Sequence, residues 1–130
     1  MLSGFCTITN NTKGTPTPVG VPFVSIKNKI LGENYELGLT LLTPQKQKAI
    51  NSKYRSKNET TNILSFPLSE TSGEITIDPI KLKKDAPLFD MSYTQFFKYL
   101  FIHGCLHLKG FEHSSTMEKE EKKYLKMFSK

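Results

Sequence analysis

All three histidines of the 130-residue chain fall within one eleven-residue stretch, as His103, His107 and His113, in the pattern H-x-x-x-H-x-x-G-x-x-H. His103 and His107 are four residues apart, so on a helix both imidazoles project from one face. Gly110 lets the chain leave the helix and turn back, which can bring a third imidazole to the same point. Three neutral imidazoles with an open fourth position suit catalytic Zn²⁺, and nitrogen ligands also permit Ni²⁺, Cu²⁺ or Co²⁺. We therefore predict a site for one divalent metal ion per chain, held by these three residues.

The residue after the first histidine distinguishes metzincin proteases from other metal enzymes with this histidine spacing. Metzincin proteases share this histidine spacing, but there a glutamate follows the first histidine and acts as the general base. This chain has Gly104 at that position, which cannot take a proton, so the sequence argues against a protease. A structural zinc module would close the site with four ligands, usually including cysteine, and Cys6 is a distant candidate for the fourth.

The histidines belong to a long helix that is predicted to begin at Ser92 and end at Gly110. A last helix is predicted from a capping box, Ser115 to Glu118, onwards. Earlier helices are predicted over 22–31 and from Thr43-Pro44 to about residue 56, and residues 79–91 suggest a short helix followed by a loop. Strands are predicted over 5–10, 35–42, 63–66 and 73–77, with Pro67 ending the third. Mixed helices and strands indicate an α/β (α+β) domain.

Two separate motifs resemble one protein family. The stretch from His103 to His113, HGCLHLKGFEH, resembles the H-G-x-L-H-L-x-G-Y-D-H signature of the YbeY family of bacterial endoribonucleases that mature ribosomal RNA. Residues 54–67, YRSKNETTNILSFP, resemble that family's Y-R-x-K-D-x-P-T-N-V-L-S-F-P block, and residues 73–77 resemble its G-D-I-x-I strand. The resemblance extends from about residue 35 to 128.

This resemblance implies a single domain over residues 1–130, with a small mixed four-stranded sheet and helices packed around it. It implies Zn²⁺ on His103, His107 and His113. It also implies an endoribonuclease that prefers single strands and acts in maturation of the 3′ end of 16S rRNA in the small subunit and in ribosome quality control. Ribosomal RNA, the small subunit and assembly factors are the expected partners. A metzincin-like metallohydrolase and a non-catalytic, zinc-containing ribosome-assembly factor are the alternatives.

The family's functional arginine maps onto Arg55, the one arginine among the 18 basic residues. A guanidinium offers two parallel donors to a phosphate, so Arg55 is predicted to stabilise phosphate charge beside a metal that activates water and polarises the scissile phosphate. Glu112, where the family usually has Asp, is a candidate for orienting a ligand or relaying a proton. Three further residues of the second motif, Asn62, Ser65 and Phe66, could contact RNA backbone or stack on a base, and Lys57 could follow phosphates. Core packing is an equally good interpretation of Phe66.

Composition sets weaker limits on function. The formal net charge of +6 at pH 7 favours polyanionic partners, although a lysine-rich solvated surface gives the same count. Bulky apolar runs are far shorter than the roughly 20 residues that span a bilayer, and residues 1–20 do not resemble a secretory signal. Two cysteines fit a reducing compartment. We therefore expect a cytoplasmic protein that does not enter a membrane.

Overall fold

A mixed β-sheet lies at the centre of the computed structural model, which describes residues 6–12, 14–53, 62–112 and 114–129. Four strands form this sheet in the described part of the chain, in the order β1-β2-β4-β3. The first three in that order are parallel, and β3 runs antiparallel to β4 at one edge. The strands are β1 (Cys6–Asn10), β2 (Glu36–Leu41), β3 (Ile63–Ser69) and β4 (Ser72–Ile77). The predicted α+β class with a small mixed four-stranded sheet is confirmed.

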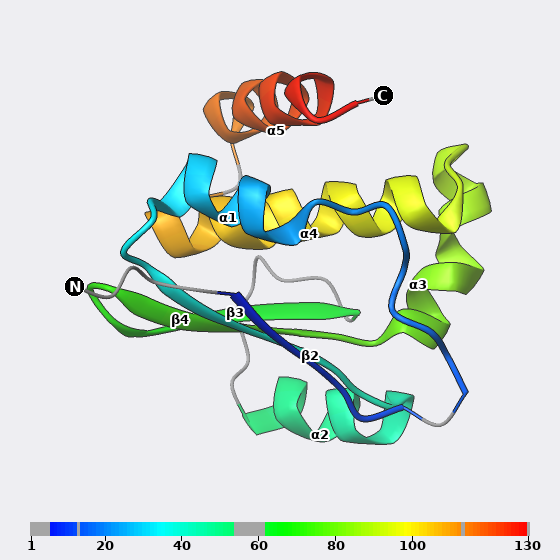
Figure 1. Ribbon diagram of the computed structural model, residues 1–130. Helices are drawn as coiled ribbons and strands as arrows, with labels where there is room; N and C mark the ends of the chain where they lie inside the picture. The colour runs from blue at the N-terminus through cyan, green and yellow to red at the C-terminus, as the bar shows by residue number, and fades with distance from the viewer. Residues whose placement is uncertain (1–5, 13, 54–61, 113, 130) are drawn as a thin grey trace.

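Helices cover both faces of the sheet (Figure 1). On one face α1 (Phe23–Leu31) and α4 (Tyr93–Lys109) lie side by side, and α5 (Ser115–Met127) lies on the outer side of α4. On the other face lies α2 (Pro44–Lys53), and α3 (Pro79–Asp85) with the short 3-10 helix η1 (Ala86–Phe89) closes one end. The helix α4 is therefore held between the sheet and α5.

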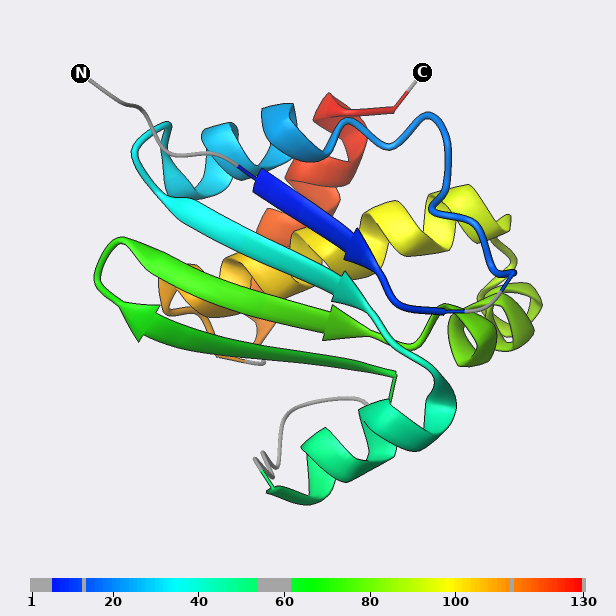
Figure 2. The ribbon, with the colours of Figure 1, turned by 60° about the horizontal axis from the view of Figure 1, so that its bottom comes forward.

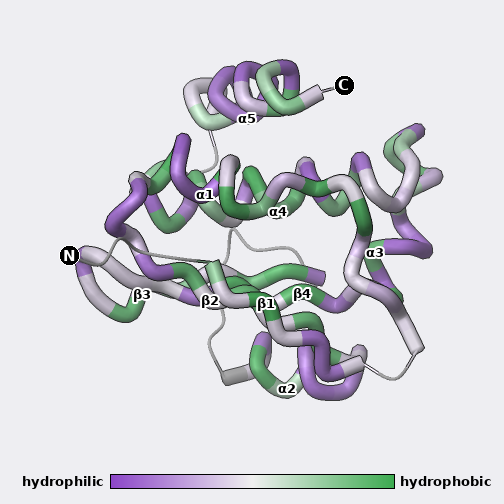
Figure 3. Tube along the Cα trace, in the orientation of Figure 1, coloured by the Kyte–Doolittle hydropathy of each residue, from purple (hydrophilic) through white to green (hydrophobic). Residues whose placement is uncertain are grey.

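The main core forms where the sheet meets α1 and α4 (Figure 2). Alternate residues of β2, Leu37, Leu39 and Leu41, are almost completely buried, as expected for a strand with one covered face. Between the two helices the ring of Phe23 meets that of Phe101 edge to face, with centroids 5.0 Å apart. Hydrophobic segments accordingly gather in the sheet and α4, whereas hydrophilic stretches are prominent on α5 (Figure 3).

Two predicted boundaries are wrong. Pro67 does not end β3, which continues to Ser69. Because β3 is an edge strand, a residue without a backbone N–H is tolerated there, and the pairing with β4 shifts register between Pro67 and Ser69. The last helix is capped by Ser114 rather than Ser115, with the Ser114 side chain accepting a hydrogen bond from the backbone N–H of Met117.

None of the helices in the described ranges has the length and apolar character needed to cross a bilayer.

Candidate metal centre

Both ends of α4 are fixed by local sequence signals. At its start the Ser92 side chain accepts from the backbone N–H of Gln95, and the Gln95 side chain accepts from the Ser92 N–H, which makes a complete capping box. At its end Gly110 adopts a left-handed conformation with φ of 115°, and the Phe111 N–H bonds back to the Leu106 carbonyl at 3.0 Å. The helix thus extends past both histidines and reverses two residues after Leu108, as the sequence predicted.

His103 and His107 point their Nε2 atoms at each other. These two nitrogens are 3.2 Å apart, and the ring planes cross at 85°. His103 is buried, with 5% of its surface exposed, whereas His107 is half-buried. The pair therefore presents two nitrogens at one point, at the border between the core and the solvent.

The hydrogen bonds of the opposite ring nitrogens, Nδ1, indicate the tautomers of the two histidines. The Nδ1 of His107 lies 3.0 Å from the backbone carbonyl oxygen of Phe111. A carbonyl oxygen only accepts, so His107 donates from Nδ1 and its neutral ring carries a lone pair on Nε2. The Nδ1 of His103 likewise faces the Glu121 carboxylate, Oε2, to which it donates. With both Nδ1 atoms donating, both Nε2 atoms can act as acceptors, and the two rings can share one cation at this point.

The carboxylate partner of His103 comes from a different helix. Glu121 lies on α5 with 5% of its surface exposed, and its other oxygen, Oε1, accepts a hydrogen bond from the Tyr99 hydroxyl at 3.4 Å. Burial, followed by the nearby Glu121 carboxylate, raises the pKa of Tyr99 to about 12, so its hydroxyl stays protonated and donates at neutral pH. Carboxylate–histidine pairs of this kind fix the tautomer and the ring orientation of metal ligands.

Sequence reasoning missed Glu121 because it lies 18 residues after His103 on another helix. A signal was present, however. Met117, Glu121 and Tyr124 recur at spacings of four and three and are all buried, so Glu121 is a carboxylate within the apolar stripe of α5. A buried carboxylate needs a hydrogen-bonding or charged partner, so this spacing already indicated that Glu121 contacts one.

The geometry of the histidine pair fits a tetrahedral metal ion. Two nitrogens at about 2.0–2.1 Å from zinc in tetrahedral geometry lie about 3.3–3.4 Å apart, close to the observed 3.2 Å. Among the described residues no three metal-ligating side chains come together, so the pair alone carries this fit. The third predicted ligand, His113, lies outside the described residues, and zinc and its ligand set stay predictions.

Gly104 faces the sheet and not the metal site. A Cβ atom at this position would lie 2.9 Å from the Ile75 Cδ1 and 2.9 Å from the Ser65 Oγ, closer than such atoms approach. A glutamate side chain therefore does not fit here unless the Ile75 and Ser65 side chains move or α4 shifts away from the strands. Close packing on β3 and β4 accounts for the glycine, and this explains physically why the protease motif is absent.

The predicted RNA-contacting residues of β3 lie in different surroundings. Ser65 faces α4, and its Oγ is buried without a hydrogen-bond partner in the described structure. Phe66 is half-buried and pairs in register with Glu74. Since side chains alternate along a strand, Phe66 lies on the face of the sheet opposite to that of Ser65. Asn62 is buried, its amide donates to Asp85 Oδ2 at 3.5 Å, and it lines the same cavity as His103. The structure thus brings Asn62 close to the histidine pair, and the contacts of all three with RNA stay predictions.

The remaining predicted site residues are Glu112, Arg55 and Lys57. Glu112 is exposed in the turn after α4, next to the Phe111 carbonyl that holds His107. Arg55 and Lys57 lie outside the described residues. Cys6, the distant candidate for a fourth ligand, belongs to β1, at the sheet edge opposite β3.

Comparisons with known proteins identify the family of this chain and support its fold. The sequence model of the family described as "Endoribonuclease YbeY" matches residues 22–129. Proteins named "Endoribonuclease YbeY" from Petrotoga mobilis and Thermodesulfovibrio yellowstonii are 37% and 39% identical, over 75% and 66% of this chain and 69% and 58% of their own lengths. A third, from Mycoplasmopsis synoviae, is 34% identical over 68% of this chain and 64% of its own length. The solution structure of TM1509 from Thermotoga maritima superposes with a TM-score of 0.66 at 23% identity, over 95% of this chain and 89% of that one.

Together, the fold and the paired histidines define a small α+β domain with a candidate metal site on its longest described helix. The chain belongs to the Endoribonuclease YbeY family. It spans about 58–69% of the length of the three relatives compared above.

Proposed function

We propose that this chain is a metal-dependent endoribonuclease that cuts single-stranded RNA, with a role in 3′-end maturation of 16S rRNA and in ribosome quality control. One observation carries the proposal. The Nε2 atoms of His103 and His107 converge at 3.2 Å while both Nδ1 atoms face acceptors, which is the state that metal ligands require. The names of the relatives add the reaction class, since they are called endoribonucleases.

Each residue then has a distinct task. His103, His107 and His113 hold one Zn²⁺, or Ni²⁺ in its place. When bound, such an ion provides Lewis-acid activation of a water and of a phosphoryl oxygen. Arg55 clamps the phosphate and stabilises the charge that develops on it. Glu112, exposed beside the turn, is available to relay a proton.

Charge and partners are consistent with this role. The formal net charge of +6 favours association with RNA, and it predicts that binding weakens as salt rises. We propose ribosomal RNA within the small subunit as the substrate, assembly factors as partners, and the cytoplasm as the compartment.

The test compares purified wild type with His107→Ala and Arg55→Ala, measuring bound metal and cleavage of a single-stranded rRNA fragment. Lys48→Ala, an exposed cation on α2, is the matched control for Arg55. We expect His107→Ala to lose metal and cleavage together. Arg55→Ala should keep metal and cut at least about 100-fold more slowly, as when one transition-state donor is removed.

A metal-loaded wild type that leaves RNA intact, alone and with ribosomal subunits, would leave only an assembly-factor role. Cleavage of a peptide substrate instead would revive the protease alternative. Full activity of Arg55→Ala would remove the phosphate clamp. Each preparation needs the His107→Ala protein as a control for contaminating ribonuclease.

A further inference from the structure

A cavity of about 280 Å³ opens beside His103, where α3 and η1 meet α4 and α5. His103 lines one part of it, and Phe89, at the end of η1, lines another. Its volume lies just below the range of small-molecule sites, which is about 300–1,000 Å³. There is room for one flat ring system rather than for a length of chain.

One wall of the cavity is a row of nearly parallel aromatic rings. Phe89 stacks on Phe96 with centroids 4.8 Å apart and planes at 22°, and Phe96 is followed by Tyr99 at 6.3 Å and 15°. The next ring is that of His103, with its centroid 6.5 Å from that of Tyr99 and its plane tilted by 39°. Although it stacks on Phe96, Phe89 remains 57% exposed. The row therefore begins in solvent and ends at the candidate metal ligand.

The carboxylates are the fully charged side chains among the described residues that line the cavity, beside the polar groups of Asn62, Tyr99, His103 and Ser114. Asp85, Glu118 and Glu121 contribute carboxylates, and no lysine or arginine is found among the described residues that line it. Asp85 is held in place by the Lys81 ammonium, at 3.2 Å, and by the Asn62 amide. Such a cavity disfavours a phosphate and favours a ligand that presents N–H groups.

We propose that this cavity binds one nucleobase of the RNA, next to the scissile phosphate, and prefers bases that carry an exocyclic amine. The inference rests on the proposed function for its substrate. Phe89, 57% exposed at the outer end of the row, provides an aromatic face for stacking of the kind that single-strand-binding proteins use, and the Asp85 carboxylate accepts from the amine. Guanine, adenine and cytosine present an NH₂ group, whereas uracil has carbonyl oxygens at the equivalent positions and only its ring N3–H as a donor, so it is disfavoured.

Binding can be tested without any cleavage. The 130-residue protein is titrated with guanosine, adenosine, cytidine and uridine, which carry no phosphate, and backbone amide shifts are followed by NMR. We expect the three amine-bearing nucleosides to shift signals of Phe89, Phe96 and residues 114–118, and uridine to bind at least about 5-fold more weakly, as for one lost hydrogen bond. Equal binding of all four nucleosides, or shifts confined to other residues, would overturn the proposal.

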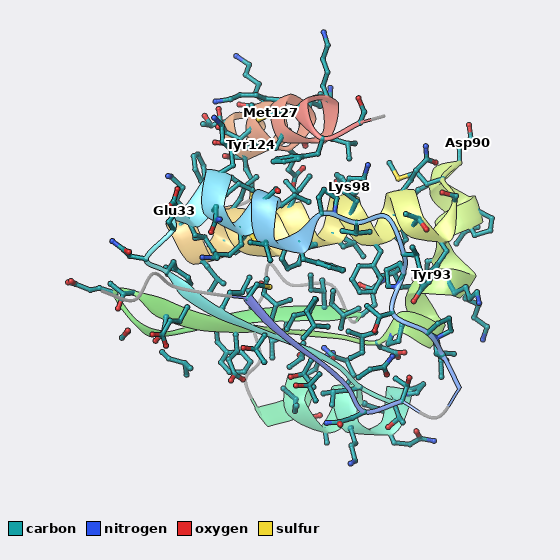
Figure 4. The ribbon with its side chains drawn as sticks, in the orientation of Figure 1. Glu33, Asp90, Tyr93, Lys98, Tyr124 and Met127 are labelled. Atoms are coloured by element: carbon teal, nitrogen blue, oxygen red, sulfur yellow. The ribbon has the colours of Figure 1, made fainter. Side chains whose placement is uncertain are left out.

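Two variants with matched controls separate stacking from amine recognition. Asp85→Asn should bring the amine-bearing nucleosides down to the level of uridine, whereas Asp90→Asn makes the same charge change outside the cavity and should alter nothing. Figure 4 shows Asp90 at the outer end of η1 with its carboxylate pointing away from the sheet. Phe89→Ala should weaken binding of all four nucleosides by about 5- to 100-fold. Its neighbour Leu88, 80% exposed and absent from the lining, provides the control Leu88→Ala.

A cleavage assay distinguishes failure of this inference from failure of the proposed function. Single-stranded RNAs that differ at one base beside the cut site are compared. If RNA is cut with no base preference and nucleosides do not bind, the base site is refuted and the nuclease stands. If nucleosides bind as expected and RNA is never cut, the nuclease is refuted and the base site stands.

Discussion

Replacing Glu121 gives the sharpest test of the metal centre, because this residue touches a predicted ligand without being one. Its Oε2 accepts from the Nδ1 of His103, and both side chains are buried. Glu121→Ala removes the acceptor and leaves that Nδ1–H without it. Glu121→Gln keeps an acceptor oxygen of nearly the same shape and removes the negative charge.

The expected magnitude follows from the single contact that is lost. Loss of a carboxylate that orients a ligating histidine typically lowers metal affinity by about 10- to 100-fold, equivalent to about 1.4–2.7 kcal/mol. We expect Glu121→Ala to lower zinc affinity within this range. Glu121→Gln should lower it by less than about 10-fold, because the hydrogen bond from His103 is kept. An unpaired buried donor also costs about 1–3 kcal/mol of folding stability, so Glu121→Ala should unfold at lower urea.

The assay is zinc affinity, measured by competition with a chromophoric chelator, with urea unfolding of the metal-free proteins as the check on folding. Glu120→Gln is the matched control, since Glu120 is the neighbour that pairs with Lys123 near the surface, at 3.5 Å. It should bind zinc as the wild type does. Wild-type zinc affinity in a folded Glu121→Ala protein would refute the reasoning from the histidine tautomers.

Three further predictions concern the core. Lys27 is fully buried and donates to the carbonyl oxygens of residues 32, 33 and 35, so Lys27→Met should lower the free energy of unfolding in urea by about 1–3 kcal/mol. Gly104→Ala should lower the free energy of unfolding by about 1–3 kcal/mol, because the added methyl group crowds the strands. Adding Ser65→Ala should restore part of this loss, since the Ser65 Oγ is one of the atoms that the methyl group meets. If the effects of the two substitutions on stability were strictly additive, this explanation would be wrong. Burial raises the pKa of Cys6 to about 11 and raises that of Cys105 well above its usual 9.0. At pH 8 fewer thiolates form, so by mass spectrometry iodoacetamide should modify Cys6 about 100-fold more slowly than in urea, and Cys105 more slowly still.

Local signals explain why much of the fold was predictable. Ser92 and Gly110 act within one turn of the chain, and they place the start and end of α4 where the sequence predicted. Alternating Leu residues in β2 indicate that one face of the strand is covered, and this inference does not require knowing which element covers it. The histidine spacing predicted that His103 and His107 share a face, and their Nε2 atoms do meet.

Tertiary contacts account for what was missed. Whether Pro67 ends β3 depends on whether that strand lies at the edge, which is a property of the whole sheet. Ser114 and Ser115 are both good caps, and only the path of the turn after α4 selects the first. The acceptor for His103 and the cavity beside it exist because α5 folds back over α4, and no spacing within α4 encodes that return.

The contact between His103 and Glu121 also joins metal binding to the docking of the last helix. Besides this contact, α5 is held to α4 by hydrogen bonds from Tyr99 and from Lys98, whose Nζ donates to the Phe128 carbonyl at 2.9 Å (Figure 4). If docked α5 strengthens the hold of the histidines on an ion, the ion must strengthen the docking of α5 by the same free energy. Amide hydrogens of α5 should then exchange more slowly when zinc is added, so the C-terminal helix would report the occupancy of a site that it does not ligate.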